Sequence, residues 1–404
     1  MEIDKMDLRS VYPYWLLEKG IQKSYPSLNK NIKADIVIVG AGISGALAAW
    51  YLRNEAFKII MIDKRHVGMG STAATTGLLQ YEIDTPFIDL NEKVGARNAA
   101  RSYALCNEAV FELERICSHF PAAEFDRKPS FQFASYKKDS KPLLLEFAAR
   151  KKLGIDVKWL DKSDIKNKFG FDKPGGILST NAADINAYGL THALLHYCTG
   201  KNLEVYDHTN IDSIHRSKIN FKLVTESGYK IHSRYVIIAC GYESSHYISK
   251  KVNELHSTYA IISEPFGSKE LWYKNTLIWE TANPYLYIRN TRDNRILVGG
   301  KDDDFSSGTR RDWALNRKAK MLEVSIKKLF PHLEFITDFK WAGLFASTKD
   351  GLPYIGSLDG RSNMLFALGF GGNGIVFGVI AGRLIRDLIT CKKNPDSKIF
   401  AFDR

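Results

Sequence analysis

Two hydrophobic patterns alternate along the chain. Ala34–Val39 (ADIVIV) is a largely apolar run, typical of a strand buried on both faces of a parallel sheet, and Lys58–Ile62 has the same character. A helical pattern from Ile43 to Arg53 separates the two runs, so this region predicts a β-α-β unit. Between residues 256 and 300, apolar and polar positions alternate instead, which predicts an antiparallel sheet.

Further elements follow from the same patterns. Residues 91–118 have apolar positions spaced by threes and fours, which predicts one long helix with a face formed by Tyr103, Cys106, Val110, Leu113 and Cys117. The remaining predicted elements are strands at Phe131–Ser135 and Val157–Leu160, consecutive strands over 203–240 ending in Tyr235–Ala239, a helix near 312–330, and a final helix from Ile375 to Leu388.

A glycine-rich turn joins the first strand to its helix. Gly40-Ala41-Gly42-Ile43-Ser44-Gly45 has the GxGxxG spacing, in which the glycines permit a tight turn, close backbone approach to a pyrophosphate, and packing of the helix on the sheet. The positive end of the helix dipole attracts the phosphates. Asp63 ends the second strand, where an acid binds a ribose hydroxyl. The context predicts FAD or NAD, although Lys64 and Arg65 leave a 2′-phosphate open.

A second glycine cluster, Gly369-Phe370-Gly371-Gly372-Asn373-Gly374, lies between the strand Met364–Leu368 and the final helix. It also fits GxGxxG, but no later strand follows to carry a second ribose-binding acid. We therefore interpret it as a helix N-terminus directed at the first ligand. Its dipole would stabilise negative charge on a reduced flavin.

The two patterns interleave along the chain, which predicts an α/β protein with a discontinuous nucleotide-binding domain. We expect that domain at 31–85, 176–250 and 336–397, and a substrate domain at 86–175 and 251–335. Residues 1–30 form an N-terminal extension in this division.

Composition and charge restrict the partners, metal sites and cellular location that we expect. The formal net charge is +12, but the basic residues are spread along the chain, which favours solubility and weak steering over nucleic-acid binding. The five cysteines include no CxxC pair and the ten histidines show no metal-ligand spacing, so we expect free thiols and no metal. A secretory signal and an apolar run long enough for a membrane helix are both missing, so we expect a cytoplasmic protein without a membrane span.

These features resemble the D-amino acid oxidase superfamily of FAD-dependent oxidoreductases, which includes glycine oxidase and sarcosine oxidase. The markers are DIVIVGAGISG with Asp63, Gly70–Leu78, Val236–Gly241, and WAGLFASTKDGLPYIG from Trp341 followed by GFGGNG. The resemblance covers nearly all of the chain after about residue 33. It implies a Rossmann-type FAD-binding domain interleaved with an α+β substrate domain built on an antiparallel sheet. It also implies FAD contacts at Gly40, Gly42, Ile43, Ser44, Gly45, Asp63, Lys64, Ser71, Thr72, Gly77, Leu78, Ala239, Cys240, Gly241, Gly343, Gly371, Gly372, Asn373, Gly374 and Ile375.

Departures from the family pattern are equally informative. The positions where some relatives attach flavin covalently are Ala74 and Gly343 here, so we expect non-covalent FAD. Glycine oxidase has an arginine where Phe345 stands and another near Gly372, while sarcosine oxidases have a lysine that corresponds to Val376. The missing carboxylate anchors argue against a simple amino acid and favour an amine whose anionic group, if any, lies elsewhere.

Strand alternation identifies candidates for the substrate pocket. Tyr285, Tyr287 and Arg289 are predicted to share one face of a strand, with Leu286 and Ile288 on the other. Tyr259 and Ile261 likewise share a face of a nearby strand. The predicted pocket residues are Tyr259, Tyr287 and Arg289 from these strands, with Phe345 and Asn373, which the resemblance of the closing block implies lie beside the flavin. Aromatic residues at strand spacing also pack sheets, so a core role remains the alternative for the tyrosines.

The sequence therefore predicts FAD-dependent oxidation of a small primary or secondary amine, amino-acid-like or polyamine-like, to an imine by hydride transfer. Oxygen is the expected acceptor by resemblance, with a quinone or carrier as the alternative. Two rivals remain: oxidation of a modified base on transfer RNA, and flavin binding without turnover. Neither the substrate nor the oligomeric state is specified by these patterns.

Overall fold

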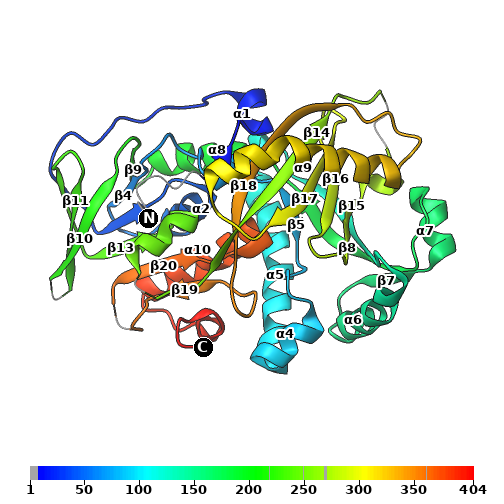
Figure 1. Ribbon diagram of the computed structural model, residues 1–404. Helices are drawn as coiled ribbons and strands as arrows, with labels where there is room; N and C mark the ends of the chain where they lie inside the picture. The colour runs from blue at the N-terminus through cyan, green and yellow to red at the C-terminus, as the bar shows by residue number, and fades with distance from the viewer. Residues whose placement is uncertain (1–7, 218, 249, 268–270, 361) are drawn as a thin grey trace.

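Two large sheets lie side by side in the computed structural model, which describes residues 8–217, 219–248, 250–267, 271–360 and 362–404 (Figure 1). The smaller has six strands in the order β19 (Tyr354–Gly356), β20 (Met364–Leu368), β13 (Tyr235–Ile238), β3 (Ile36–Val39), β4 (Ile59–Ile62) and β9 (Leu203–Tyr206). All its pairings are parallel except that of β19 with β20. The predicted α/β class and Rossmann-type unit are confirmed.

The six-stranded sheet is buried on both faces, which explains its uninterrupted apolar strands. Ile36 and Ile38 contribute to one core with α2 (Ile43–Leu52), α8 (Ala187–Thr199) and α10 (Gly374–Ile389). Val37 and Val39 point into a second core. That core is covered by a four-stranded sheet of β10 (Ile211–Ser217), β11 (Asn220–Thr225), β12 (Lys230–Ser233) and β2 (Ile32–Lys33).

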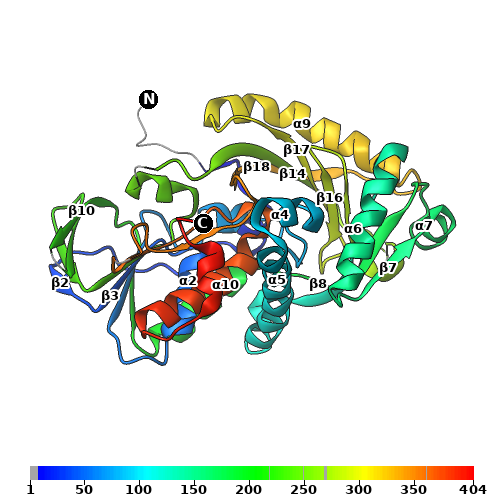
Figure 2. The same cartoon turned by 90° about the horizontal axis from the view of Figure 1, so that it is seen from below.

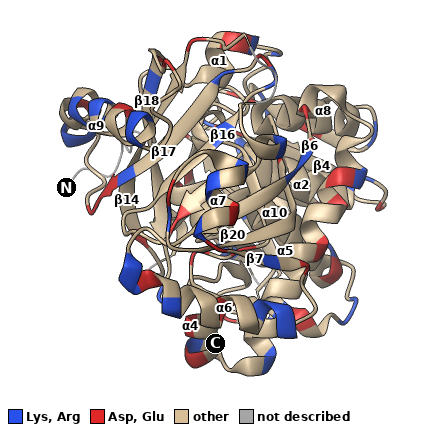
Figure 3. Ribbon diagram, turned by 90° about the vertical axis from the view of Figure 1, so that its right-hand side faces the viewer, with Lys and Arg blue, Asp and Glu red and all other residues tan. Residues whose placement is uncertain are grey.

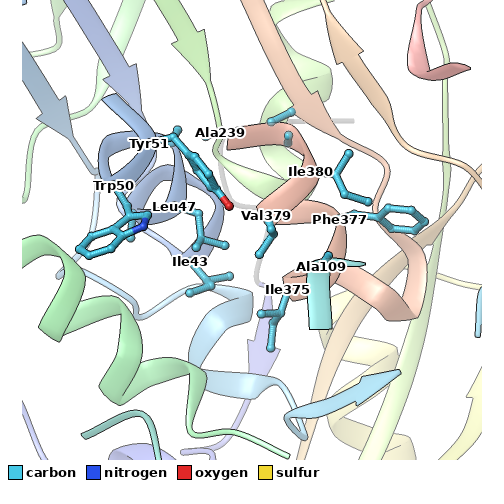
Figure 4. Close-up of a cluster of buried hydrophobic side chains, with 14 of the residues drawn as sticks. Ile43, Leu47, Trp50, Tyr51, Ala109, Ala239, Ile375, Phe377, Val379 and Ile380 are labelled. Carbon is cyan, nitrogen blue, oxygen red and sulfur yellow. The ribbon is translucent and has the colours of Figure 1, made fainter. Parts of the chain in front are cut away.

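Helices α2 and α10 pack against each other beneath the six-stranded sheet (Figure 2). Figure 4 shows Leu47 and Tyr51 of α2 facing Val379 of α10, with Ile43 and Ile375 nearby. Both helices begin at glycine clusters, so this packing fixes the two glycine-rich N-termini relative to each other.

The larger sheet has ten strands and is mostly antiparallel. Its order is β1 (Arg9–Ser10), β18 (Thr337–Ser347), β14 (Glu254–Ser263), β17 (Ile296–Asp303), β16 (Leu286–Asn290), β15 (Leu277–Glu280), β6 (Asp126–Phe133), β8 (Gly176–Asp184) and β5 (Leu78–Gln80), with β7 (Val157–Leu160) paired to β8. The antiparallel prediction for 256–300 is confirmed. Strands β8 and β18 belong to this sheet, although the predicted boundaries grouped their residues with the nucleotide-binding segments; the domain division stays a prediction.

Helix α9 (Gly308–Leu329) covers one face of this sheet, as Figure 2 shows, and begins four residues before the predicted 312. The core between them contains Ile261, Ile288 and Val298. At the outer edge lie α6 (Ser140–Lys152) and α7 (Lys162–Phe169), beside β7 (Figure 1).

The single helix predicted over 91–118 is wrong. The chain forms α4 (Phe87–Val94) and α5 (Ala96–Cys117), and Gly95 between them has a φ of 81°, a left-handed value that ends α4. The predicted apolar face is confirmed, because all five of its residues are buried.

The described part of the N-terminal extension adds a strand to the large sheet. Strand β1 pairs with β18, and α1 (Tyr14–Lys19) follows it. The indole of Trp15 donates a hydrogen bond to the carbonyl of Thr75 at 2.7 Å, so the extension supports the segment 70–78. Among the described helices, none combines the length and apolarity needed to cross a bilayer.

Candidate functional site

A cavity of about 1060 Å³ runs between the two sheets. Its lining includes the first glycine turn, the segment 70–78, the loop after β13, the second glycine cluster, and side chains from β14, β15, β16, β17 and β18. Small-ligand sites usually measure about 300–1,000 Å³, so this volume suits an extended ligand with room for a second small molecule.

The glycine turn is built as its motif requires. Gly40 has a φ of 107°, and a Cβ at Gly45 would stand 2.0 Å from the carbonyl oxygen of Gly40. Asp63 accepts hydrogen bonds from the N–H groups of Ala41 at 2.7 Å and Arg65 at 2.8 Å. Burial raises the pKa of Asp63, and these two hydrogen bonds oppose that effect. The carboxylate therefore fixes the turn at the end where a ribose is expected.

Lys64 and Arg65 are both engaged by Glu243. Lys64 Nζ lies 2.8 Å from Glu243 Oε1, and the Arg65 guanidinium donates to both carboxylate oxygens at 2.8 and 2.9 Å. Burial acts to raise the pKa of Glu243, but the hydrogen bonds from Arg65 and Lys64 hold it below its usual value. Lys64 and Arg65, the two basic residues that could have bound a 2′-phosphate, are thus both paired with the carboxylate of Glu243.

The segment after α2 and β4 crosses the cavity as α3 (Ser71–Ala74) and the strand β5. Thr72 Oγ1 accepts a hydrogen bond from the N–H of Ile43, at the first turn of α2. Within the described chain, Ser71 Oγ is buried without a partner and borders the cavity, as expected of a group that awaits a ligand. Gly77, at a φ of 72°, lies against the carbonyl of Ile185.

The second glycine cluster forms the short 3-10 turn η6 (Gly371–Asn373) and the start of α10. The side-chain amide of Asn373 donates to the carbonyl of Glu82 at 2.6 Å, which ties this helix end to the chain after β5. The N–H of Gly372 donates to Asp84 Oδ2 at 2.7 Å. Gly371–Ile375 line the cavity, so the N-terminus of α10 borders it, as the N-terminus of α2 does.

Ala239, Cys240 and Gly241 follow β13 and border the same cavity. Burial raises the pKa of the Cys240 thiol to about 12, so it stays protonated at neutral pH. Its sulfur lies 3.5 Å from Ser244 Oγ in η4 (Gly241–Tyr247). All five cysteines are free. Cys240 is thus a small buried residue, and its chemistry is not that of a reactive thiolate.

The far end of the cavity is aromatic. Tyr285 and Tyr287 have ring centroids 5.8 Å apart, and Trp279 packs edge-on to Tyr285 at 6.2 Å. Tyr287 hydrogen-bonds with the side chains of Thr258 and Thr76. Tyr242 and Phe345 also line the cavity.

Two of the predicted substrate residues are bonded to other parts of the protein. The Tyr259 ring is 0% exposed; although it borders the cavity, it packs in the core beneath α9 and its hydroxyl donates to Asp303. Arg289 is absent from the cavity lining; it donates to the carbonyl of Gly77 at 3.2 Å and thus supports the cofactor segment. Tyr287, Phe345 and Asn373 do line the cavity, so their binding roles stay predictions.

Sequence reasoning missed two carboxylates at the aromatic end, Asp84 and Asp302. Asp84 is exposed toward the cavity, but the surrounding protein desolvates its carboxylate and so raises its pKa. Hydrogen bonds from Gly372 and Tyr285 oppose this rise. Desolvation raises the pKa of Asp302 to about 6, and repulsion from Asp84 adds to the effect. The available signal was strand alternation, which places Asp302 on the face opposite Asp303.

A group of metal-type side chains, His66, Asp207 and His208, lies outside the cavity lining. His66 Nδ1 is 3.1 Å from Asp207 and His66 Nε2 is 3.2 Å from His208 Nε2. These contacts form a hydrogen-bonded chain that needs no ion.

A family model described as FAD dependent oxidoreductase matches residues 35–388. The chain belongs to this family. Gamma-glutamylputrescine oxidoreductase of Escherichia coli is 25% identical over 93% of this chain and 88% of its own length. Glycine oxidase of Bacillus subtilis is 25% identical over 91% and 96%. The crystal structure of glycine oxidase from Geobacillus kaustophilus superimposes with a TM-score of 0.75 at 20% identity, over 92% of this chain and 99% of that one, and so shares the fold.

FAD is the cofactor of this FAD-dependent oxidoreductase, and the residues of the cavity fit it. The cavity-lining N-termini of α2 and α10, the orphaned Ser71 hydroxyl and Asp63 fit the phosphate, flavin and ribose parts of FAD. The lining combines apolar and polar groups along its length, as an extended dinucleotide requires.

Proposed function

We propose that this protein oxidises a small amine to an imine, with FAD held non-covalently. The observation that carries the proposal is the continuity of the cavity, which passes from the glycine turns into an aromatic chamber beside Gly371–Ile375. Its relatives support the reaction class, since glycine oxidase and gamma-glutamylputrescine oxidoreductase carry names of enzymes that act on amines.

FAD, when bound, supplies a two-electron acceptor for the hydride that leaves the carbon beside the neutral amine nitrogen, and water hydrolyses the resulting iminium to a carbonyl compound and ammonia or a smaller amine. The protein orients the reactants and excludes water. Tyr287, fixed by Thr258 and Thr76, forms one wall of the chamber, and Phe345 forms another. Asn373 holds the α10 N-terminus in place through the Glu82 carbonyl.

The chamber favours a substrate without a carboxylate next to the reacting carbon. Among the described residues that line the cavity, the basic side chains are Lys64, Arg65, Arg216 and His246. They belong to the loop after β4, to β10 and to η4, and none belongs to the large sheet that forms the aromatic end. An α-carboxylate would therefore meet Phe345 and two aspartates where a basic partner is needed.

An anaerobic absorbance titration of the purified holoenzyme with a panel of amines tests the proposal. Bleaching of the flavin bands by an amine, followed by their return on admission of air with formation of hydrogen peroxide, is the expected result. Bleaching that air does not reverse, but a quinone does, would keep amine oxidation and change the acceptor. A flavin that no amine reduces, although dithionite does, would overturn the proposed function.

A further inference from the structure

Two carboxylates, Asp84 and Asp302, line the cavity together with the aromatic residues, and none of the described basic lining residues belongs to the large sheet that forms this end. Repulsion from Asp84 raises the pKa of Asp302, so the charges interact, and both also act on Tyr285. Asp302 Oδ1 is a buried atom without a hydrogen-bond partner among the described residues. Buried charge is costly unless it is paired, so an arrangement of this kind calls for a positive ligand.

The basic side chains that act on Asp302 are already engaged by other groups. Lys318 and His256 both lower the pKa of Asp302, but Lys318 Nζ lies 2.6 Å from Asp303 Oδ1 and 2.6 Å from the carbonyl of Lys301. His256 Nδ1 lies 3.1 Å from Asp304, and its Nε2 faces Ser347 at 2.8 Å. Both basic groups are thus engaged elsewhere, and Asp302, which has a side-chain hydrogen bond with Thr258, lines the cavity.

The walls around the two carboxylates also suit a cation. The faces of tyrosine and tryptophan rings are negative and attract ammonium groups, more strongly when water is excluded. Tyr285 connects the two features, because its hydroxyl lies 3.4 Å from Asp84 Oδ1 while its ring contacts Tyr287 and Trp279. Carboxylates and aromatic faces in one enclosed chamber form a recognisable ammonium site.

The position of Asp84 relates this site to the flavin end of the cavity. Asp84 contacts the N–H of Gly372, and a side chain on Gly371 or Gly372 would come within 2.7 Å of the Asp84 carboxylate. Glycine at both positions thus leaves room for the acid at the start of α10. An ammonium bound there would lie within reach of the family's flavin-binding glycines.

We infer that Asp84 and Asp302 bind a positively charged nitrogen of the substrate that is not the nitrogen being oxidised, so that the preferred substrate is a small diamine or longer polyamine. The inference rests on the proposed function. It goes further by naming the substrate class and the two residues that select it.

Three amines of matched length test the selection: 1,4-diaminobutane, n-butylamine, which lacks the second nitrogen, and 4-aminobutanoate, which replaces it with a carboxylate. Half-saturation is measured anaerobically on the holoenzyme, from flavin reduction or, where none occurs, from the shift of the flavin spectrum. We expect the diamine to bind at least about tenfold more tightly than butylamine, with 4-aminobutanoate weakest. Equal affinity for all three, or tighter binding of 4-aminobutanoate, would overturn the inference.

Asp84→Asn and Asp302→Asn attribute the preference to these residues. Each change removes a charge while keeping shape and a hydrogen-bond acceptor, and should bring the diamine to within about threefold of butylamine. Asp89→Asn is the matched control, since Asp89 is exposed on α4 and outside the cavity lining, and should keep the full preference. A diamine preference that survives in both aspartate variants would refute the assignment.

The diamine site and the proposed amine oxidation can be refuted independently. If butylamine and 4-aminobutanoate bleach the flavin as readily as the diamine, amine oxidation stands and the diamine site is wrong. If the diamine binds selectively through Asp84 and Asp302 but no amine bleaches the flavin, the site stands and the proposed reaction is wrong.

Discussion

Asp63 accepts hydrogen bonds from two backbone N–H groups, those of Ala41 and Arg65, so one carboxylate both shapes the glycine turn and faces the expected ribose. Asp63→Ala should weaken FAD binding about tenfold to a hundredfold, because hydrogen bonds to a charged group contribute about 1.5–3 kcal/mol. Titration of the apoprotein with FAD, followed by flavin fluorescence, measures the change. Asp89→Ala serves as control, and unchanged affinity in Asp63→Ala would contradict the assigned role.

The ionised carboxylate of Asp302 should favour amine binding but lower the stability of the amine-free protein. Burial raises its folded pKa to about 6, above the ordinary value of 3.8, so ionisation destabilises the amine-free protein. This carboxyl's contribution to stability is complete below pH 3.8 and is lost as pH rises through about 6. Asp302→Asn should therefore raise the Tm at pH 8 and matter less at pH 5, in melts without amine. A lower Tm at pH 8 would show that the carboxylate is already paired.

The predicted pocket residues were only partly located correctly from the sequence. Phe345 and Asn373 are predicted from the resemblance of the closing block to the family, and both line the cavity. Tyr259 and Leu286 both pair with Gly300, so Tyr259 lies on the face of the sheet opposite to that of Tyr287. Alternation within a strand gives no information on the register between strands. The sequence therefore could not show whether Tyr259 and Tyr287 lie on the same face of the sheet.

At the scale of elements, the contact between α2 and α10 determines how the two glycine clusters face one cavity (Figure 4). A Cβ at Gly382 would lie 2.5 Å from Tyr51 Cδ2 and 3.1 Å from the carbonyl oxygen of Leu47. Gly382→Val should lower the free energy of unfolding by about 1–3 kcal/mol through overpacking. Denaturant unfolding of the holoenzyme measures the loss.

The control for this change is Gly267→Val, because Gly267 is exposed and a Cβ there meets nothing within 4 Å. It should leave stability nearly unchanged. If Gly382→Val were equally harmless, the close approach of the two helices would not be a constraint on the site.

Elements were predictable where local pattern decides them. The β-α-β unit, the antiparallel strands and the final helix follow from periodicity and turn motifs, and their ends shift by only a few residues. The break at Gly95 was missed because apolar spacing continues from α4 into α5, and the local signal is the exposed glycine itself, whose positive φ ends α4. Pairing of β8 and β18 with distant strands of the large sheet likewise depends on contacts that no local pattern contains.

At the scale of the whole molecule, overall charge and site charge have opposite signs. The chain carries a formal net charge of +12, and Figure 3 shows Lys and Arg interspersed with Asp and Glu over the helices in view, including α6, α7 and α9. The aromatic end of the cavity instead contains Asp84 and Asp302. Net charge therefore gives no guide to the substrate, because recognition depends on the few groups that the fold encloses.

The folded protein is expected to hold FAD without a covalent bond. Covalent attachment needs a nucleophilic side chain at the flavin, and the positions where some relatives carry one are Ala74 and Gly343 here. The pKa of about 12 for Cys240 keeps that cavity-lining thiol protonated and unreactive. FAD should thus be retained only by the enclosing sheets, loops and helix N-termini, and unfolding should release it.

Acid precipitation of the holoenzyme should leave essentially all flavin in the supernatant, where mass and fluorescence identify it as FAD. Mild treatment that removes FAD without unfolding should give an apoprotein of lower Tm, and added FAD should restore the original value, because a ligand that binds only the folded state stabilises it. Flavin that stays with the precipitated chain would indicate a covalent bond. Mapping of the flavin-bearing peptide would then show whether Cys240 is the attachment point despite its raised pKa.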